Sequence, residues 1–137
     1  MKLNGIIERK LRTIEENIEA IKSWQIESFQ QFSESSLLQK ATERALQISI
    51  EVMIDISERI LALNKLTPED TSVENMQKLE KLGVIQSAND YADMIRFRNF
   101  IVHRYEKVDA EIVYSIIKNK LNLFEKFVKE IRSYNLP

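Results

Sequence analysis

A seam of positions four and three apart runs along the start of the chain, at Ile7, Leu11, Ile14, Ile18, Ile21 and Gln25. This spacing is typical of an amphipathic helix with one buried face. It predicts a first helix that begins near Lys2 or Leu3 and runs to at least Trp24, or as far as Phe32. The serine-rich segment 33–36 ends the pattern, and its hydroxyls can accept hydrogen bonds from the free N–H groups of the next helix.

A second, longer helix is predicted from about residue 37 to about residue 64. Its apolar positions again lie three and four apart, at Leu38, Ala41, Ala45, Ile48, Val52, Ile56, Ile60 and Leu63. A turn around Pro68 separates it from a short helix of residues 73–82, which Ser72 can cap. Gly83 follows that helix and is suited to the left-handed conformation that ends many helices.

Two further long helices complete the pattern. Ser87 can open a helix from about Ala88 to His103, with Asp90 as the acidic member of a capping box. Asp109 can cap a last helix of about residues 110–134, whose apolar positions cover more than a third of its circumference. A helix that is apolar over so wide an arc is expected to contact more than one neighbour.

Two surface features each leave two interpretations open. A polar row runs along the second helix at Arg44, Gln47, Glu51 and Asp55. It is either a solvated face or part of an interface, because small residues beside it would let another helix approach closely. The aromatic residues Trp24, Phe29 and Phe32 form either a core contact between the first two helices or a patch that binds a partner.

The composition narrows the fold to a few long helices. Only two glycines and two prolines occur among the 137 residues, which leaves little room for hairpins. The length suits one domain, and we expect residues 1–137 to form it. The predicted class is all-α: an antiparallel four-helix bundle with one short additional helix.

Charge and cysteine content exclude several classes of function. The net charge is −1, so any binding of nucleic acid phosphates depends on a local basic patch. The chain has no cysteine and one histidine, which excludes disulfides and thiolate ligands, and no carboxylate spacing suggests a metal site. We therefore expect no metal and no cofactor. Early acidic residues argue against a signal peptide, and no apolar run could span a bilayer, so we expect a cytoplasmic protein without a membrane partner.

The segment 96–105 concentrates the candidate chemistry. It contains the single histidine, His103, and three arginines, among them Arg98. Histidine exchanges protons near neutral pH, and arginine binds phosphate in a two-point contact. Together they suit cleavage of a phosphodiester by its neighbouring 2′-hydroxyl, with Asn99 orienting the imidazole or the phosphate. A helix-capping histidine beside arginines in surface ion pairs is the alternative interpretation.

Helical spacing sets a condition on such a site. Asn99 and His103 are four residues apart and share one face of a helix. Arg98 and His103 are five apart, which is about 140° around the helix axis. They converge only if the helix end distorts or if a second chain contributes to the site.

The run Arg98-Asn99-Phe100-Ile101-Val102-His103-Arg104-Tyr105 resembles the signature of HEPN domains. Arg98, His103 and Tyr105 match the narrower HepT-like pattern of arginine, four residues, histidine, one residue, tyrosine. Residues 41–47, 79–85 and 105–114 also resemble segments of this subgroup, in the same order. The resemblance therefore covers roughly residues 40–127.

The resemblance implies a HEPN-like bundle that forms a homodimer, with the motifs of two subunits facing one cleft. It implies a metal-independent endoribonuclease toxin acting on tRNA or mRNA, with Arg98 and His103 catalytic and Asn99 supporting. The cognate antitoxin would be an MntA-like minimal nucleotidyltransferase that transfers AMP to Tyr105. Arg96 and Arg104 would contact the RNA backbone.

Two other functions remain open at this point. The bundle could be a non-catalytic subunit that binds a nucleotide or substrate for its nucleotidyltransferase partner. It could also be a structural dimer in which the Arg98 and His103 cluster forms an interface network.

Overall fold

The structure is a computed structural model that describes residues 5–103 and 109–137, with only the backbone at positions 102 and 103. Every regular element in these ranges is a helix, so the predicted all-α class is confirmed. The helices are α1 (Gly5–Ser23), α2 (Phe29–Ser33), α3 (Ser36–Leu63), α4 (Ser72–Lys81), α5 (Asn89–His103), α6 (Ala110–Asn119) and α7 (Leu121–Ser133). No helix in the described ranges has the length and hydropathy needed to cross a bilayer.

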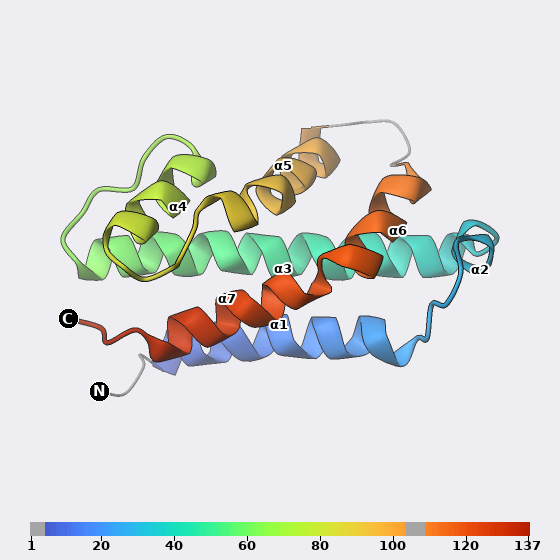
Figure 1. Ribbon diagram of the computed structural model, residues 1–137, viewed down its shortest axis with the longest axis horizontal. Coiled ribbons are helices and arrows are strands. Elements are labelled where there is room, and N and C mark those ends of the chain that lie inside the picture. The colour runs from blue at the N-terminus through green and yellow to red at the C-terminus, as the bar shows by residue number, and fades with distance from the viewer. Residues whose placement is uncertain (1–4, 104–108) are drawn as a thin grey trace.

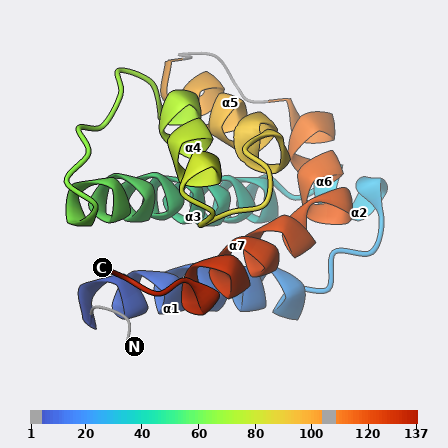
Figure 2. The ribbon, with the colours of Figure 1, turned by 60° about the vertical axis from the view of Figure 1, so that its left-hand side comes forward.

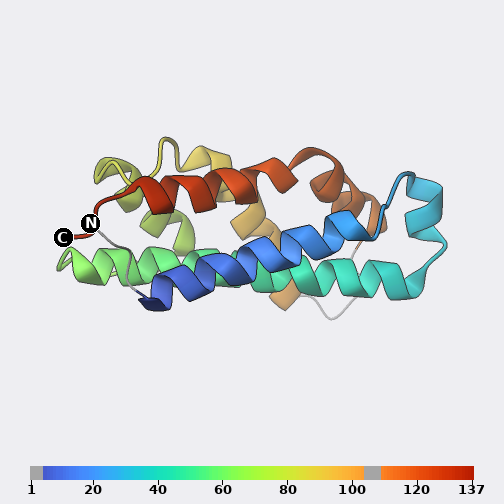
Figure 3. The same cartoon turned by 90° about the horizontal axis from the view of Figure 1, so that it is seen from below.

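Helix α3 runs through the middle of the molecule. Helices α4 and α5 lie on one side of it and α1 lies on the other (Figures 1 and 2). Helix α7 lies beside α1, and the start of α1 and the end of α7 are at the same end of the molecule (Figure 3). One continuous apolar core joins these helices. Since α5 rests on α3, the motif segment is supported by the centre of the fold.

The burial of α3 is wider than its predicted stripe. Ala45, Ile56 and Ile60 are buried as predicted, but Leu63, at the end of the stripe, is 40% exposed. Leu46, Ile50, Met53 and Leu61 are also buried, from positions outside the stripe. The stripe was wrong in width because helices pack against α3 on several sides, whereas a single stripe assumes one neighbour.

The first helix ends at Ser23, one residue before its shortest predicted extent and well before the longest. Five of the six predicted seam positions, from Ile7 to Ile21, are buried, whereas the sixth, Gln25, is exposed and lies beyond the end of α1. The chain then turns at Gln25, whose φ is +52°, and α2 begins as a separate helix after the Ser28 cap. This turn folds α2 back over α3 and α6, where Phe32 is fully buried and contacts the ring of Tyr114. The predicted start near Lys2 lies outside the described residues.

Local signals placed several helix ends correctly. Ser35 accepts a hydrogen bond from the backbone N–H of Leu38, and Asp109 accepts one from that of Glu111. Gly83 has a φ of +78°, as its predicted role requires. Thr71, one residue before the predicted Ser72, caps α4.

The predicted single last helix is wrong, because two helices meet at Lys120. The backbone of Lys120 departs from helical geometry, with φ −126° and ψ 2°. Helix α6 packs on α2 and α3, whereas α7 packs on α1. The break lets each half bury its apolar side against different neighbours, which a straight helix of this length could not do. The prediction of several partner helices is confirmed.

Candidate functional site

Helix α5 is fixed to α7 at its first turn. Tyr91 is fully buried, packs edge-on against Phe127, and donates a hydrogen bond to the carboxylate of Glu130. The pKa of the Tyr91 hydroxyl is raised far above its usual value, mainly because the group is buried and secondly because it is hydrogen bonded to the Glu130 carboxylate. Lys126 forms an ion pair with Asp90 at 2.6 Å. These contacts hold the helix that carries the motif in a defined position.

Arg98 is the unusual residue of α5. Its side chain is half-buried, and its Nε is buried without a hydrogen bond partner. Four other arginines, at positions 12, 59, 96 and 132, form ion pairs. Among the described arginines, Arg98 alone has a buried nitrogen without a hydrogen bond partner. A guanidinium held in this way keeps its charge and its donors available for a phosphate.

Arg96 and Asn99 lie toward solvent. Arg96 donates a hydrogen bond to Asp93 at 2.9 Å, and 64% of its side chain is exposed. Asn99 follows Arg98 in the helix, so the two side chains leave the axis about 100° apart. Arg98, the predicted phosphate ligand, therefore lies on the inner side of α5. Asn99, the predicted orienting residue, lies on its outer side.

The rest of the predicted site lies at or beyond the end of α5. His103 is the last residue of the helix, and its side chain lies outside the described residues. Arg104 and Tyr105 also lie outside them. Within the described part of the chain, no three acidic or histidine side chains are grouped so that they could bind a metal ion.

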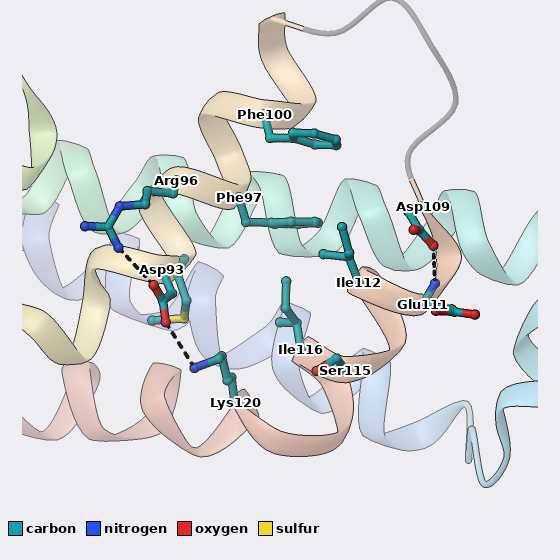
Figure 4. Close-up of a pocket in the computed structure, with 11 residues that line it drawn as sticks. Asp93, Arg96, Phe97, Phe100, Asp109, Glu111, Ile112, Ser115, Ile116 and Lys120 are labelled. Atoms are coloured by element: carbon teal, nitrogen blue, oxygen red, sulfur yellow. Dashed lines mark hydrogen bonds and ion pairs between the residues drawn. The ribbon is translucent and has the colours of Figure 1, made fainter.

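A groove that the sequence did not indicate lies between α5 and α6 (Figure 4). Its volume is about 510 Å³. Phe97 and Phe100 line it from α5, and Ile112 and Ile116 line it from α6. The sequence signal of a further contact surface was the wide apolar arc of the predicted last helix.

The polar row of α3 belongs largely to the solvated surface. Arg44 and Glu51 are exposed. Gln47 donates a hydrogen bond to Glu51, and Asp55 binds Lys10 of α1 at 2.7 Å. The row therefore contributes a structural contact between α1 and α3.

The aromatic cluster of α2 serves mainly as a core contact. Phe32 is fully buried, whereas Phe29 is 37% exposed and packs edge-on against Tyr114. Of the two interpretations that the sequence left open, the structure favours packing, although the neighbour is α6.

Comparison with known proteins gives concordant matches. The profile of the family described as ribonuclease HepT-like matches residues 14–131. The tRNA nuclease HepT of Aphanizomenon flos-aquae is 30% identical over 131 residues, covering 94% of this chain and 89% of that protein. The mRNA nuclease HepT of Shewanella oneidensis is 27% identical over 133 residues, covering 96% and 99%.

A solved structure matches the fold over almost the whole chain. It is a tri-AMPylated HEPN toxin of Shewanella oneidensis in complex with an MNT antitoxin. The TM-score is 0.87 at 27% sequence identity, and the match covers 96% of this chain and all of the other.

Proposed function

The chain belongs to the HepT-like ribonuclease family, and on that premise we propose that it is a ribonuclease toxin neutralised by a nucleotidyltransferase antitoxin. Two relatives of nearly the same length are RNA nucleases, and a solved structure shows a HEPN toxin of Shewanella oneidensis in complex with an MNT antitoxin. The observation that carries the proposal is Arg98 at the motif position, a half-buried arginine whose Nε has no hydrogen bond partner among the described residues. Holding a charged group in this way costs stability and suits a site that binds an anion.

The proposed reaction uses the RNA's own 2′-hydroxyl as nucleophile. The 2′-oxygen attacks the adjacent phosphorus, the bond from phosphorus to the 5′-oxygen breaks, and a 2′,3′-cyclic phosphate and a 5′-hydroxyl result. Arg98 stabilises the added negative charge on the phosphoryl oxygens. His103 transfers protons, either from the 2′-hydroxyl or to the leaving 5′-oxygen. This chemistry requires no metal ion, and the substrate is RNA, either tRNA or mRNA.

We propose that two chains complete one site. Arg98 lies on the inner side of α5, and helical spacing sets position 103 about 140° away from it. A homodimer with the two motifs facing each other would supply Arg98 from one protomer and His103 from the other. Asn99, which is exposed, would orient the imidazole or the phosphate.

Neutralisation is proposed to act on Tyr105. Its phenolic oxygen would attack the α-phosphorus of ATP on an MntA-like nucleotidyltransferase, which forms a tyrosyl-AMP bond and releases pyrophosphate. The added phosphodiester and nucleoside would block RNA by charge and bulk. Arg96 and Arg104 would contact the RNA backbone, and Arg96 would first have to exchange its ion pair with Asp93.

The test is a cleavage assay in excess EDTA with protein purified without the antitoxin. We expect RNA cleavage with 2′,3′-cyclic phosphate ends, a loss of at least about 100-fold in His103→Ala, and a similar loss in Arg98→Ala. Arg44→Ala, which removes an exposed arginine, is the matched control and should cleave normally. Unchanged cleavage in both motif variants would refute the proposed site.

The same preparation tests the alternative of a non-catalytic subunit. That alternative predicts no cleavage at any protein concentration together with tight binding of the antitoxin. Intact mass after co-expression should show AMP additions of about 329 Da each, the AMP residue mass, and Tyr105→Phe should remove them.

A further inference from the structure

We propose that the groove between α5 and α6 binds a nucleobase of the RNA strand next to the scissile phosphate. This inference rests on the proposed ribonuclease function. It assigns part of the substrate contact to residues outside the motif. The proposed occupant is a single unstacked base.

The lining of the groove suits a flat aromatic ring. Phe97 and Phe100 extend from α5 toward α6, where Ile112 and Ile116 face them (Figure 4). Phe97 and Ile116 are buried and form the floor, while Phe100 is half-buried and Ile112 is 43% exposed at the mouth. Proteins that bind single strands place bases on aromatic side chains in this way. The groove volume of about 510 Å³ lies in the range of small-molecule sites.

The charges at the two ends of the groove differ in sign. At one end Asp93 binds both Arg96 at 2.9 Å and Lys120 at 3.5 Å, so two cations share one carboxylate. At the other end Asp109 and Glu111 place two carboxylates at the start of α6 (Figure 4). A nucleotide is complementary to this arrangement, since its phosphate is anionic and the base edge carries hydrogen bond donors.

The acidic end also predicts which bases are preferred. Adenine, cytosine and guanine carry exocyclic amino groups, which donate hydrogen bonds to carboxylates, whereas uracil has none. One oxygen of Asp109 already accepts the backbone N–H of Glu111 at 2.8 Å, which leaves the second oxygen for a ligand. We therefore expect weaker binding of uracil than of the other three bases.

The position of the groove relative to the motif supports the same occupant. Phe97 and Phe100 flank the motif residues Arg98 and Asn99 in the sequence. Arg96 lines the groove and also faces solvent on the outer side of α5. Position 103 is three residues beyond Phe100, on the same side of an ideal helix. A base in the groove would thus lie about one helical turn from the proposed proton-transfer residue.

The experiment measures binding of fluorescent ten-residue oligonucleotides of adenylate and of uridylate, made with 2′-deoxyribose so that they are not cleaved. We expect wild type to bind the adenylate strand at least about 5-fold more tightly. Phe100→Leu should weaken adenylate binding by about 10-fold, and Phe100→Trp should restore it, since stacking needs an aromatic ring. Phe29→Leu changes an exposed ring on α2 and is the matched control, with no change expected.

Two results would overturn the inference. Equal adenylate affinity of wild type and Phe100→Leu would show that no base stacks in the groove. A lower molar mass of Phe100→Leu in light scattering would show that a second copy of the chain occupies the groove.

Cleavage of RNA by wild type in EDTA, abolished by Arg98→Ala, is measured alongside. If that cleavage is present and the binding prediction fails, only the groove assignment is wrong, whereas its absence refutes the proposed function.

Discussion

Replacing Arg98 with methionine should stabilise the protein while abolishing RNA cleavage. The Nε of Arg98 is buried and makes no hydrogen bond within the described residues. Leaving a buried donor unsatisfied costs about 1–3 kcal/mol. Methionine extends about as far as the Nε of arginine and has no N–H group to desolvate, so this substitution removes the cost and keeps the apolar contacts of the stem.

The expected gain lies at the lower end of that range. Arg98 is only half-buried, so water satisfies the rest of the guanidinium. We therefore expect a gain of about 1 kcal/mol in the free energy of unfolding. For a chain of 137 residues, this corresponds to a rise in Tm of about 3 °C.

The assay is thermal unfolding followed by circular dichroism, paired with the RNA cleavage assay. Arg44→Met is the matched control, because Arg44 is exposed, and its Tm should stay within about 2 °C of wild type. Both variants are measured at two protein concentrations, so that a contribution from self-association becomes visible. A fall in the Tm of Arg98→Met of more than about 3 °C, with Arg44→Met unchanged, would refute the reasoning. It would mean that Arg98 stabilises the fold.

Two further predictions concern contacts that hold α7 in place. Tyr91→Phe removes a hydrogen bond to the Glu130 carboxylate and should lower the free energy of unfolding by about 1.5 kcal/mol, or the Tm by about 5 °C. The control Tyr134→Phe loses a hydrogen bond of 3.3 Å to the neutral amide of Asn64 and should change the Tm by less than about 2 °C. Equal changes in Tm for the two variants would contradict the prediction. Arg132→Gln should lower the Tm more at pH 7 than at pH 3. The hydrogen bond from Arg132 holds the pKa of Glu15 below its usual 4.5, so its stabilisation is fully present above pH 4.5 and decreases as the pH falls and the carboxylate becomes protonated. A Tm difference independent of pH would count against this prediction.

Features set by short-range interactions were predictable from the sequence. The seam of α1 was predicted correctly from Ile7 to Ile21 and failed only at Gln25, because one neighbouring surface covers one side of that helix. The caps at Ser35 and Asp109 and the left-handed Gly83 were also predicted. Each involves hydrogen bonds or backbone sterics within a few residues, so the local sequence contains the information.

The candidate site was only partly predictable. The motif pattern pointed to Arg98, and the structure places that residue half-buried, with an Nε that has no hydrogen bond partner in the described part of the chain. The same pattern gave no sign of the groove beside Phe100, because its other wall comes from α6, after the turn that follows α5. A surface built from two helices depends on how those helices pack, and no spacing within one segment encodes it.

By itself the sequence determined the helical class, most helix ends and the family to which the chain belongs, through periodicity, capping residues and the motif beginning at Arg98. Only the tertiary structure decided the break at Lys120, the wide burial of α3 and the environment of Arg98. The physical reason is the range of the interactions. Hydrogen bonds of a helix connect residues four apart, whereas burial depends on which distant segments cover a side chain.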